Sequence, residues 1–194
     1  DKSCQSCHAK EVDLWKKSDH FKAMEPANDS TVLGDFNNAT LTADGISSKF
    51  FRREGKYFIN TQGPDGANKD FEVLYTFGFK PLQQYLVAFP GGKMQVPRMS
   101  WDVQKKKWFH QYAGEKIHHN DWLHWSRGGQ NWNTMCASCH STNLQKNYLP
   151  DADSFHTTYS VMTVSCESCH GPASKHVDFV SAENYKDAEK VKYS

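Results

Sequence analysis

The sequence predicts an α+β fold in which short helices with little regular core accompany an inserted antiparallel β module. Three observations lead to this prediction. All six cysteines of the 194-residue chain fall in three copies of one short motif. Apolar residues make up 38% of the chain and the mean hydropathy is −0.76, which is low for a core built from side chains alone. Residues 31–113 lack the motif and show alternating residues and frequent turn signals, a pattern typical of antiparallel strands.

The repeated motif is Cys-x-x-Cys-His, and it lies at residues 4–8, 136–140 and 166–170. This spacing is the attachment pattern of c-type haem, because one tight turn presents two thiols to the porphyrin edge and an imidazole to the iron. We therefore predict three covalently bound haem c groups, whose apolar surfaces account for the low hydropathy, and the fold of a multihaem cytochrome c. The predicted attachment cysteines are Cys4, Cys7, Cys136, Cys139, Cys166 and Cys169, and the predicted proximal iron ligands are His8, His140 and His170.

Other uses of paired cysteines fit the motif less well. A zinc ribbon needs two Cys-x-x-Cys pairs for one tetrahedral site, so three pairs leave one stranded. A disulfide framework normally has staggered spacings and does not repeat one motif. A thioredoxin-like redox motif occurs once, in a βαβ unit.

The chain is expected to form a single domain with three parts. Residues 1–30 form the first haem unit, residues 31–113 the β-rich module, and residues 114–194 the second and third haem units. Helical spacing predicts a helix over residues 10–24, ended by Pro26. Further predictions are a strand over 71–79, helical turns over 81–88, strands over 93–103 and 107–112, a helix over 173–182, and a charged, helical or frayed tail over 183–194.

His20 is the first candidate for a distal, or sixth, iron ligand. It follows His8 by twelve residues, about 18 Å along a helix, so it should not return to the haem of its own motif. We expect it to ligate a different iron, and the alternative is a solvated histidine on a polar helix face.

The residues around the motifs resemble those of multihaem cytochromes of the c-554 type, relatives of the octahaem hydroxylamine and tetrathionate enzymes. Residues 166–176 are similar to that group's C-x-x-C-H-G-P-x-S-x-H element, and residues 4–20 are similar to its first haem unit. The resemblance is closer to a tri-haem subset, often fused to tetratricopeptide repeats, through segments 32–39, 80–86 and 131–140. The chain has three attachment motifs, whereas c-554 itself has four.

The resemblance implies closely packed haems with two histidine ligands each. His176 is then a distal ligand, and it follows His170 by too few residues to reach the far face of the same haem. A reciprocal arrangement pairs His176 with the first haem and His20 with the third. For the second haem the candidates are His124 and then His110, which lie beside tryptophans and resemble family positions. A solvated role is expected for His118, His119 and His156, and Met135 and Met162 are the alternative ligands, with core packing as their ordinary role.

Electron transfer is the leading functional hypothesis, because irons with two axial ligands have no position for a substrate; the chain is accordingly predicted not to be an enzyme. One alternative is a redox enzyme for a small oxyanion, of the nitrite or hydroxylamine type, at a five-coordinate haem with Arg98 or Arg127 nearby. The other is a subunit of a polymeric extracellular cytochrome filament. Expected partners are other redox proteins or cytochromes.

The sequence also argues against two classes of partner. No basic stripe suited to nucleic acid is present, and no run of eighteen apolar residues predicts a membrane span. Covalent haem attachment takes place outside the cytoplasm, and the chain begins three residues before its first motif, as expected for an exported chain whose signal was removed. We therefore expect a periplasmic or extracellular location.

Overall fold

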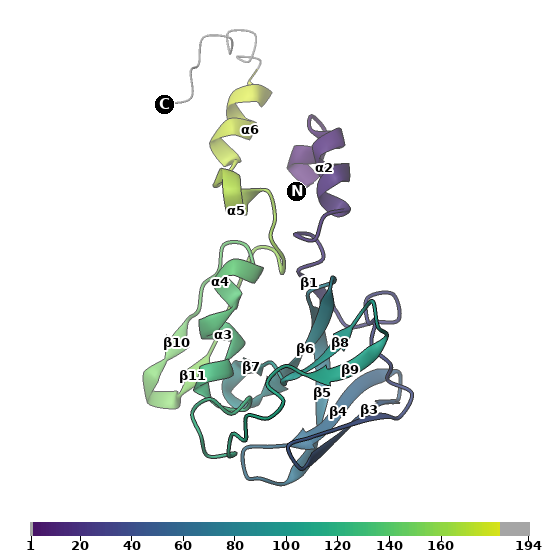
Figure 1. The fold of residues 1–194 in the computed structure, drawn as a ribbon. Coiled ribbons are helices and arrows are strands. Elements are labelled where there is room, and N and C mark those ends of the chain that lie inside the picture. Colours follow the sequence, from purple (N-terminus) through teal and green to yellow (C-terminus); the bar gives the residue numbers. More distant parts are fainter. Residues whose placement is uncertain (1, 183–194) are drawn as a thin grey trace.

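A nine-stranded antiparallel sheet is the main body of the protein in the computed structural model, which describes residues 2–182 (Figure 1). The strand order is β2-β3-β4-β5-β6-β8-β9, with β1 added beside β5 and β7 beside β6. Strands β2 and β9 approach each other, so the sheet is nearly closed and barrel-like. The strands are β1 Met24–Pro26, β2 Ala39–Ala43, β3 Ile46–Arg53, β4 Lys56–Gln62, β5 Asn68–Phe77, β6 Leu82–Phe89, β7 Lys93–Gln95, β8 Met99–Asp102 and β9 Lys107–His110.

Two tight hairpins start this sheet. The β2–β3 turn is Asp44-Gly45, with φ angles of 52° and 83°, and the β3–β4 turn is Glu54-Gly55, with φ angles of 52° and 75°. Two consecutive residues at positive φ match the twist of antiparallel strands, and an acidic residue followed by glycine tolerates this conformation well. The turns set the register in which Phe50 of β3 lies opposite Ile59 of β4, and both side chains are buried.

Aromatic side chains fill the interior of the barrel. The Trp108 ring stacks on the Phe50 ring with centroids 3.6 Å apart and planes at 4°. Phe36 meets both rings edge-on, and the Trp108 indole N–H donates to the Asp35 carbonyl at 2.9 Å. The buried members of this cluster are Phe36, Phe50, Tyr57, Ile59, Val73, Tyr85, Val87, Met99, Trp101, Trp108 and Trp125.

A second, smaller core joins the sheet to the segment of the second motif. Trp132 and Ala137 are fully buried there against Leu86 of the sheet, and Cys136 packs beside them. The helices outside the sheet are short: α1 Lys2–Gln5, α2 Ala9–Lys16, α3 Trp132–Met135, α4 Ala137–His140, α5 Glu167–His170 and α6 Ser174–Ser181. The remaining elements are the 3₁₀ turns η1 Pro90–Gly92, η2 Gly128–Gln130 and η3 Pro150–Ala152, and the hairpin of β10 Tyr148–Leu149 with β11 Ser154–Phe155.

The predicted fold class, an α+β multihaem cytochrome with little regular core, is wrong. The protein is mostly sheet, with few short helices and a large side-chain core inside a nearly closed barrel. The error arose because tryptophan and tyrosine have low hydropathy values, although their rings bury large apolar areas once their polar atoms are paired. Low hydropathy therefore did not mean a missing core.

Two predicted helices also need correction. The helix expected over residues 10–24 ends at Lys16, and the chain then turns at Ser18, whose hydroxyl donates to the Trp15 carbonyl at 2.6 Å, before β1 joins β5. The helical turns expected over residues 81–88 are also absent, because strand β6 covers Leu82–Phe89 and buries Tyr85, Leu86 and Val87 fully in the sheet.

Other local predictions are confirmed. The strand expected over residues 71–79 is β5, and the helix expected over 173–182 is α6. The strand predicted over 93–103 is divided into β7 and β8, and the one over 107–112 corresponds to β9. The predicted tail over 183–194 lies outside the described residues.

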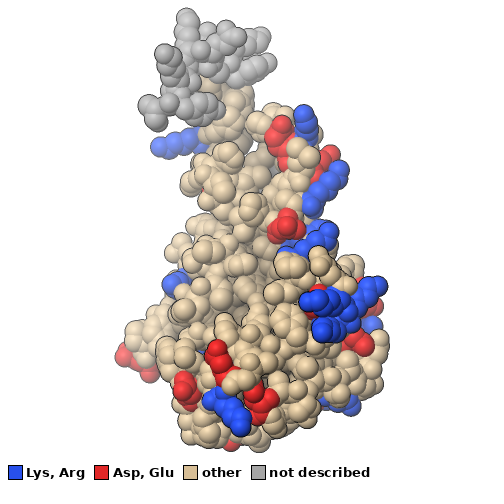
Figure 2. Space-filling view, in the orientation of Figure 1, with Lys and Arg blue, Asp and Glu red and all other residues tan. Residues whose placement is uncertain are grey.

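The surface carries charges of both signs. On the face drawn in Figure 2, lysine and arginine side chains lie in mixed groups with aspartate and glutamate. Within residues 2–182, none of the helices has the length and apolar character needed to cross a membrane.

Candidate haem-attachment sites

The three Cys-x-x-Cys-His motifs share one backbone conformation. In each, a single helical turn lets the histidine N–H donate to the carbonyl of the first cysteine, at 2.8 Å in the first motif, 3.1 Å in the second and 3.0 Å in the third. The N–H of the second cysteine donates to the same carbonyl at 3.2, 3.1 and 3.2 Å. Residues three and four apart on a helical turn lie on one face, so each motif presents two thiols and an imidazole together.

These turns fit the group that the spacing predicts. None of the six cysteines forms a disulfide, and in each motif the second cysteine is exposed and the first is partly exposed. Large apolar side chains also stand exposed beside the motifs: Leu14 on α2 is 60% exposed, Met135 before the second motif 63%, and Phe179 on α6 38%. Two thiols, an imidazole and adjacent apolar surface are what attachment of a haem requires.

The second motif is the most firmly packed against the barrel. The Asn133 side-chain carbonyl accepts the Met94 N–H of β7 at 2.8 Å, and its amide donates to Thr157 Oγ1 at 2.9 Å. The His140 ring lies 4.4 Å from the Phe77 ring, and burial lowers the pKa of this histidine. Its Nδ1 is buried without a hydrogen-bond partner among the described residues.

Hydroxyl groups connect the second motif to the third. Thr142 lies two residues after the second motif, and its hydroxyl is 2.7 Å from that of Ser168, inside the third motif. The same Thr142 oxygen accepts the Ser165 N–H at 2.9 Å. Gly171 then ends α5 at φ 74°, and the Glu167 carboxylate accepts the Ala173 N–H at 3.0 Å, just before α6 begins. The Thr142 hydroxyl thus positions the third motif against the second, through Ser168 and the Ser165 N–H.

The first and third motifs lie side by side, although more than 150 residues separate them in the sequence (Figure 1). The Trp15 indole N–H donates to the Val164 carbonyl at 2.8 Å, and the Thr163 hydroxyl donates to the His20 carbonyl at 2.5 Å. These bonds tie the segment after α2 to the segment that enters the third motif. The sequence did not predict these contacts of Trp15 and Thr163, because no local pattern marks such distant partners.

The structure brings His176 of α6 close to His8 of the first motif. Their ring centroids are 6.3 Å apart, and the ring planes differ by 36°. An imidazole nitrogen binds a first-row metal at about 2 Å, so two rings facing one metal ion from opposite sides have centroids roughly 6 Å apart. The observed separation therefore fits an iron between the two rings. The His20 ring is exposed and has no hydrogen bond or ring contact with His170 among the described residues.

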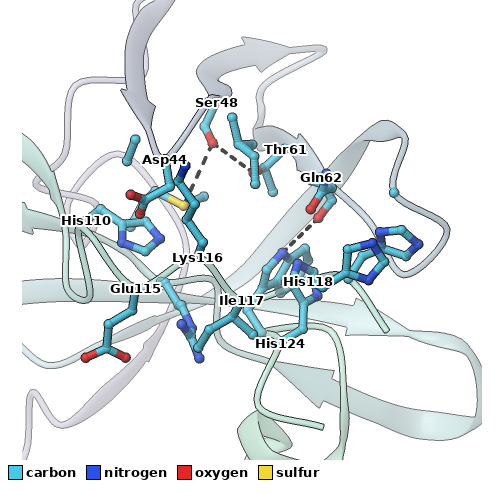
Figure 3. Close-up of a pocket in the computed structure, with 18 of the residues that line it drawn as sticks. Asp44, Ser48, Thr61, Gln62, His110, Glu115, Lys116, Ile117, His118 and His124 are labelled. Atoms are coloured by element: carbon cyan, nitrogen blue, oxygen red, sulfur yellow. Dashed lines mark hydrogen bonds between the residues drawn. The ribbon is translucent and has the colours of Figure 1, made fainter. Parts of the chain in front are cut away.

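Four of the remaining histidines lie away from the motifs, around a cavity of about 690 Å³ (Figure 3). The cavity is bordered by the β2–β3 turn, the β4–β5 loop and the segment after β9, and none of the described residues that line it belongs to a motif. The four histidines are His110, His118, His119 and His124.

His124 is the most enclosed of these four. Its ring is 5% exposed, and Nδ1 lies 2.8 Å from the Ser126 hydroxyl. Burial, followed by the charge of Arg98, lowers the pKa of His124 to about 4. Burial also lowers the pKa of His110, whose Nδ1 accepts the Tyr112 N–H at 3.2 Å. Within the described part of the chain, neither ring lies against a motif histidine.

The remaining candidate residues are dispersed over the molecule. His156 is exposed, and its backbone N–H donates to the Asn147 carbonyl at 3.1 Å. Met162 packs beside the second core, whereas Met135 is exposed. Arg127 donates from Nη2 to the Pro64 carbonyl at 2.9 Å, while Arg98 is buried at the cavity.

Comparison with known proteins gives one family match. The family model described as "cytochrome c554 and c-prime" matches residues 3–44 and 99–171. The first matched segment contains the first motif and the second contains the other two, whereas strands β3 to β7 lie outside the match. No similar curated protein and no similar solved structure was found. Because the matched segments make up more than half of the chain, the chain belongs to the cytochrome c554 and c-prime family, whose members are c-type cytochromes with covalently bound haem.

Proposed function

We propose that this protein transfers electrons through three haem c groups, one at each Cys-x-x-Cys-His turn. Membership of a c-type cytochrome family supports covalent haem and agrees with electron transfer. The shared backbone conformation of the three motifs supports haem attachment at each of them. Haem, when bound, supplies one-electron chemistry at its iron, while the chain supplies the thiols, the axial ligands and the surroundings that set the potential.

The axial ligands of the first haem are His8 and His176 in this proposal. The observation that carries it is the 6.3 Å separation of their rings, which suits an iron between two imidazoles. The position of α6 supports the assignment, because α6 follows Gly171 and lies beside the N-terminal helical segment that carries the first motif. Residues 166–176 then provide ligands for two different haems.

His20 is proposed as the distal ligand of the third haem, opposite His170. Support comes from the backbone, since the Thr163 hydroxyl holds the His20 carbonyl beside the segment that enters the third motif. For the second haem, His124 and then His110 stay the predicted partners of His140. The Ser126 hydroxyl beside Nδ1 leaves Nε2 as the ligating nitrogen of His124, an arrangement common among metal-binding histidines.

An electron carrier suits this ligand set better than an enzyme does, because two strong axial ligands leave no position for a substrate. We place the protein in the periplasm or outside the cell, where haem is attached and where another redox protein or cytochrome, including a second copy of this chain, would exchange electrons with it. Exposed cysteine turns support such exchange, since a haem there lies near the surface.

The haem count and the spin state of the irons test this function. The pyridine haemochrome absorbance of the holo-protein, divided by the protein concentration, should give three haems per chain. Electron paramagnetic resonance of the oxidised protein should show low-spin iron only. A count below three, or a high-spin iron in the wild-type protein, would contradict the tri-haem carrier.

The assignment of His176 has its own test. His176→Ala should convert one of the three irons to high spin, whereas the exposed control His156→Ala should leave all three low-spin. His124→Ala tests the second haem in the same way. An unchanged spectrum in His176→Ala would remove this residue from the ligand set.

A further inference from the structure

Arg98 is a buried cation without an acidic partner among the described residues. Its side chain is 7% exposed, and none of the ion pairs in residues 2–182 includes it. One terminal nitrogen donates to the Leu123 carbonyl, and the guanidinium lies over the Tyr112 ring, 4.8 Å from its centroid. The Nε–H has no hydrogen-bond partner in the part of the chain that the structure describes. The carboxylates of Glu115 and Asp121 act on Arg98 through space, but neither forms an ion pair with it. A buried charge without an ion-pair partner is costly.

Arg98 lines the barrel cavity, and the acidic residues there are already engaged or face solvent. The Asp44 carboxylate accepts the Gly114 N–H at 3.0 Å. Asp65 pairs with Lys69 at 2.6 Å, and Glu115 is exposed. Arg98 therefore keeps an unpaired Nε–H at the cavity, where a ligand carrying an anion would find a partner.

The cavity favours an anionic group attached to an apolar body. Its volume of about 690 Å³ is in the range of small-molecule sites and is large for a bare inorganic anion. The walls include Leu41, Ile46, Met99 and Trp125. Figure 3 shows His124, His118 and His110 around the space.

We propose that this cavity binds a carboxylate carried on an apolar body, with Arg98 as its ion-pair partner. Two sources carry such a group. One is a diffusible organic acid, which would bind beside Arg98 and away from the three attachment motifs. The other is a propionate of one of the haems, in which case Arg98 would adjust the midpoint potential of that haem.

Benzoate titrated into the oxidised holo-protein by calorimetry tests the first source. We expect saturable binding, weaker binding of the neutral analogue benzyl alcohol, and a loss of at least about tenfold in benzoate affinity in Arg98→Gln. The control is Arg53→Gln, which removes an exposed arginine paired with Asp70 and should leave the affinity unchanged. Ala43→Phe, which places a ring at the edge of the cavity, should block benzoate and serves if Arg98→Gln does not fold.

Potentiometry distinguishes the second source. If Arg98 pairs with a haem propionate, benzoate does not bind, and Arg98→Gln changes the midpoint potential of one haem while Arg53→Gln changes none. Ala43→Phe should then also disturb that haem. Absence of benzoate binding together with unchanged potentials in Arg98→Gln and Ala43→Phe would overturn the proposal.

Discussion

The barrel and the two terminal helical segments differ in what stabilises them. The barrel contains eleven buried residues in one cluster, with rings stacked and edge-on at close distance. Helices α2 and α6 have eight residues each, and α6 has no buried residue in the structure. Isolated helices of this length are marginal in water. From this comparison we infer that the barrel is stabilised by its own side chains, and we expect the helical segments to depend on bound haem.

The largest expected effect follows from removing haem attachment at the first and third motifs. Replacing Cys4, Cys7, Cys166 and Cys169 by alanine should raise hydrogen exchange in α2 and α6 to nearly unprotected rates, because their apolar surfaces lose the porphyrins. Strands β3 to β6 should keep their protection. Exchange measured by mass spectrometry on both proteins checks this, and loss of protection in the barrel would show that the two regions fold as one unit.

Truncating a side chain inside the barrel should instead destabilise the barrel itself. Trp108→Ala removes a ring stacked on Phe50 and should lower the free energy of unfolding of the barrel by about 3–5 kcal/mol. The matched control is Trp122→Ala at a 68% exposed site, with an expected change within about 0.5 kcal/mol. Urea unfolding followed by far-ultraviolet circular dichroism gives both free energies. An equal decrease in the two variants would contradict a barrel stabilised by its buried side chains.

The smallest expected effect is the pH-dependent contribution of one carboxylate on the outer barrel surface to folding stability. Hydrogen bonds from Asn60 at 2.8 Å and Arg53 at 2.9 Å lower the pKa of the Asp70 carboxyl below its ordinary value. The ionised carboxylate therefore stabilises the folded state above about pH 4, and this contribution is lost as the pH falls through the lowered pKa. Asp70 is partly exposed, so the contribution should be below about 1 kcal/mol.

The stability difference between wild type and Asp70→Asn measures this contribution. It should be largest near pH 6 and should shrink as the pH approaches 3, in urea titrations at constant ionic strength. A difference that stays constant across this range would mean that ionisation of Asp70 does not stabilise the barrel.

Several features were determined by the sequence alone, because each depends on residues a few positions apart. The three attachment turns are local, since the histidine N–H bonds to a carbonyl four residues earlier. Strand β5 and helix α6 follow from short periodic patterns. The hairpin turns at Asp44-Gly45 and Glu54-Gly55 are also local.

Only the tertiary structure decided the closure of the barrel, the 6.3 Å approach of His8 and His176, and the burial of Arg98 beside a cavity. Each of these joins residues that are distant in sequence, so no local pattern contains them. Composition led to a wrong prediction of the fold class, because hydropathy values treat each residue separately. The free energy of a barrel core comes from rings such as Phe50 and Trp108 meeting across strands, and that depends on register and closure.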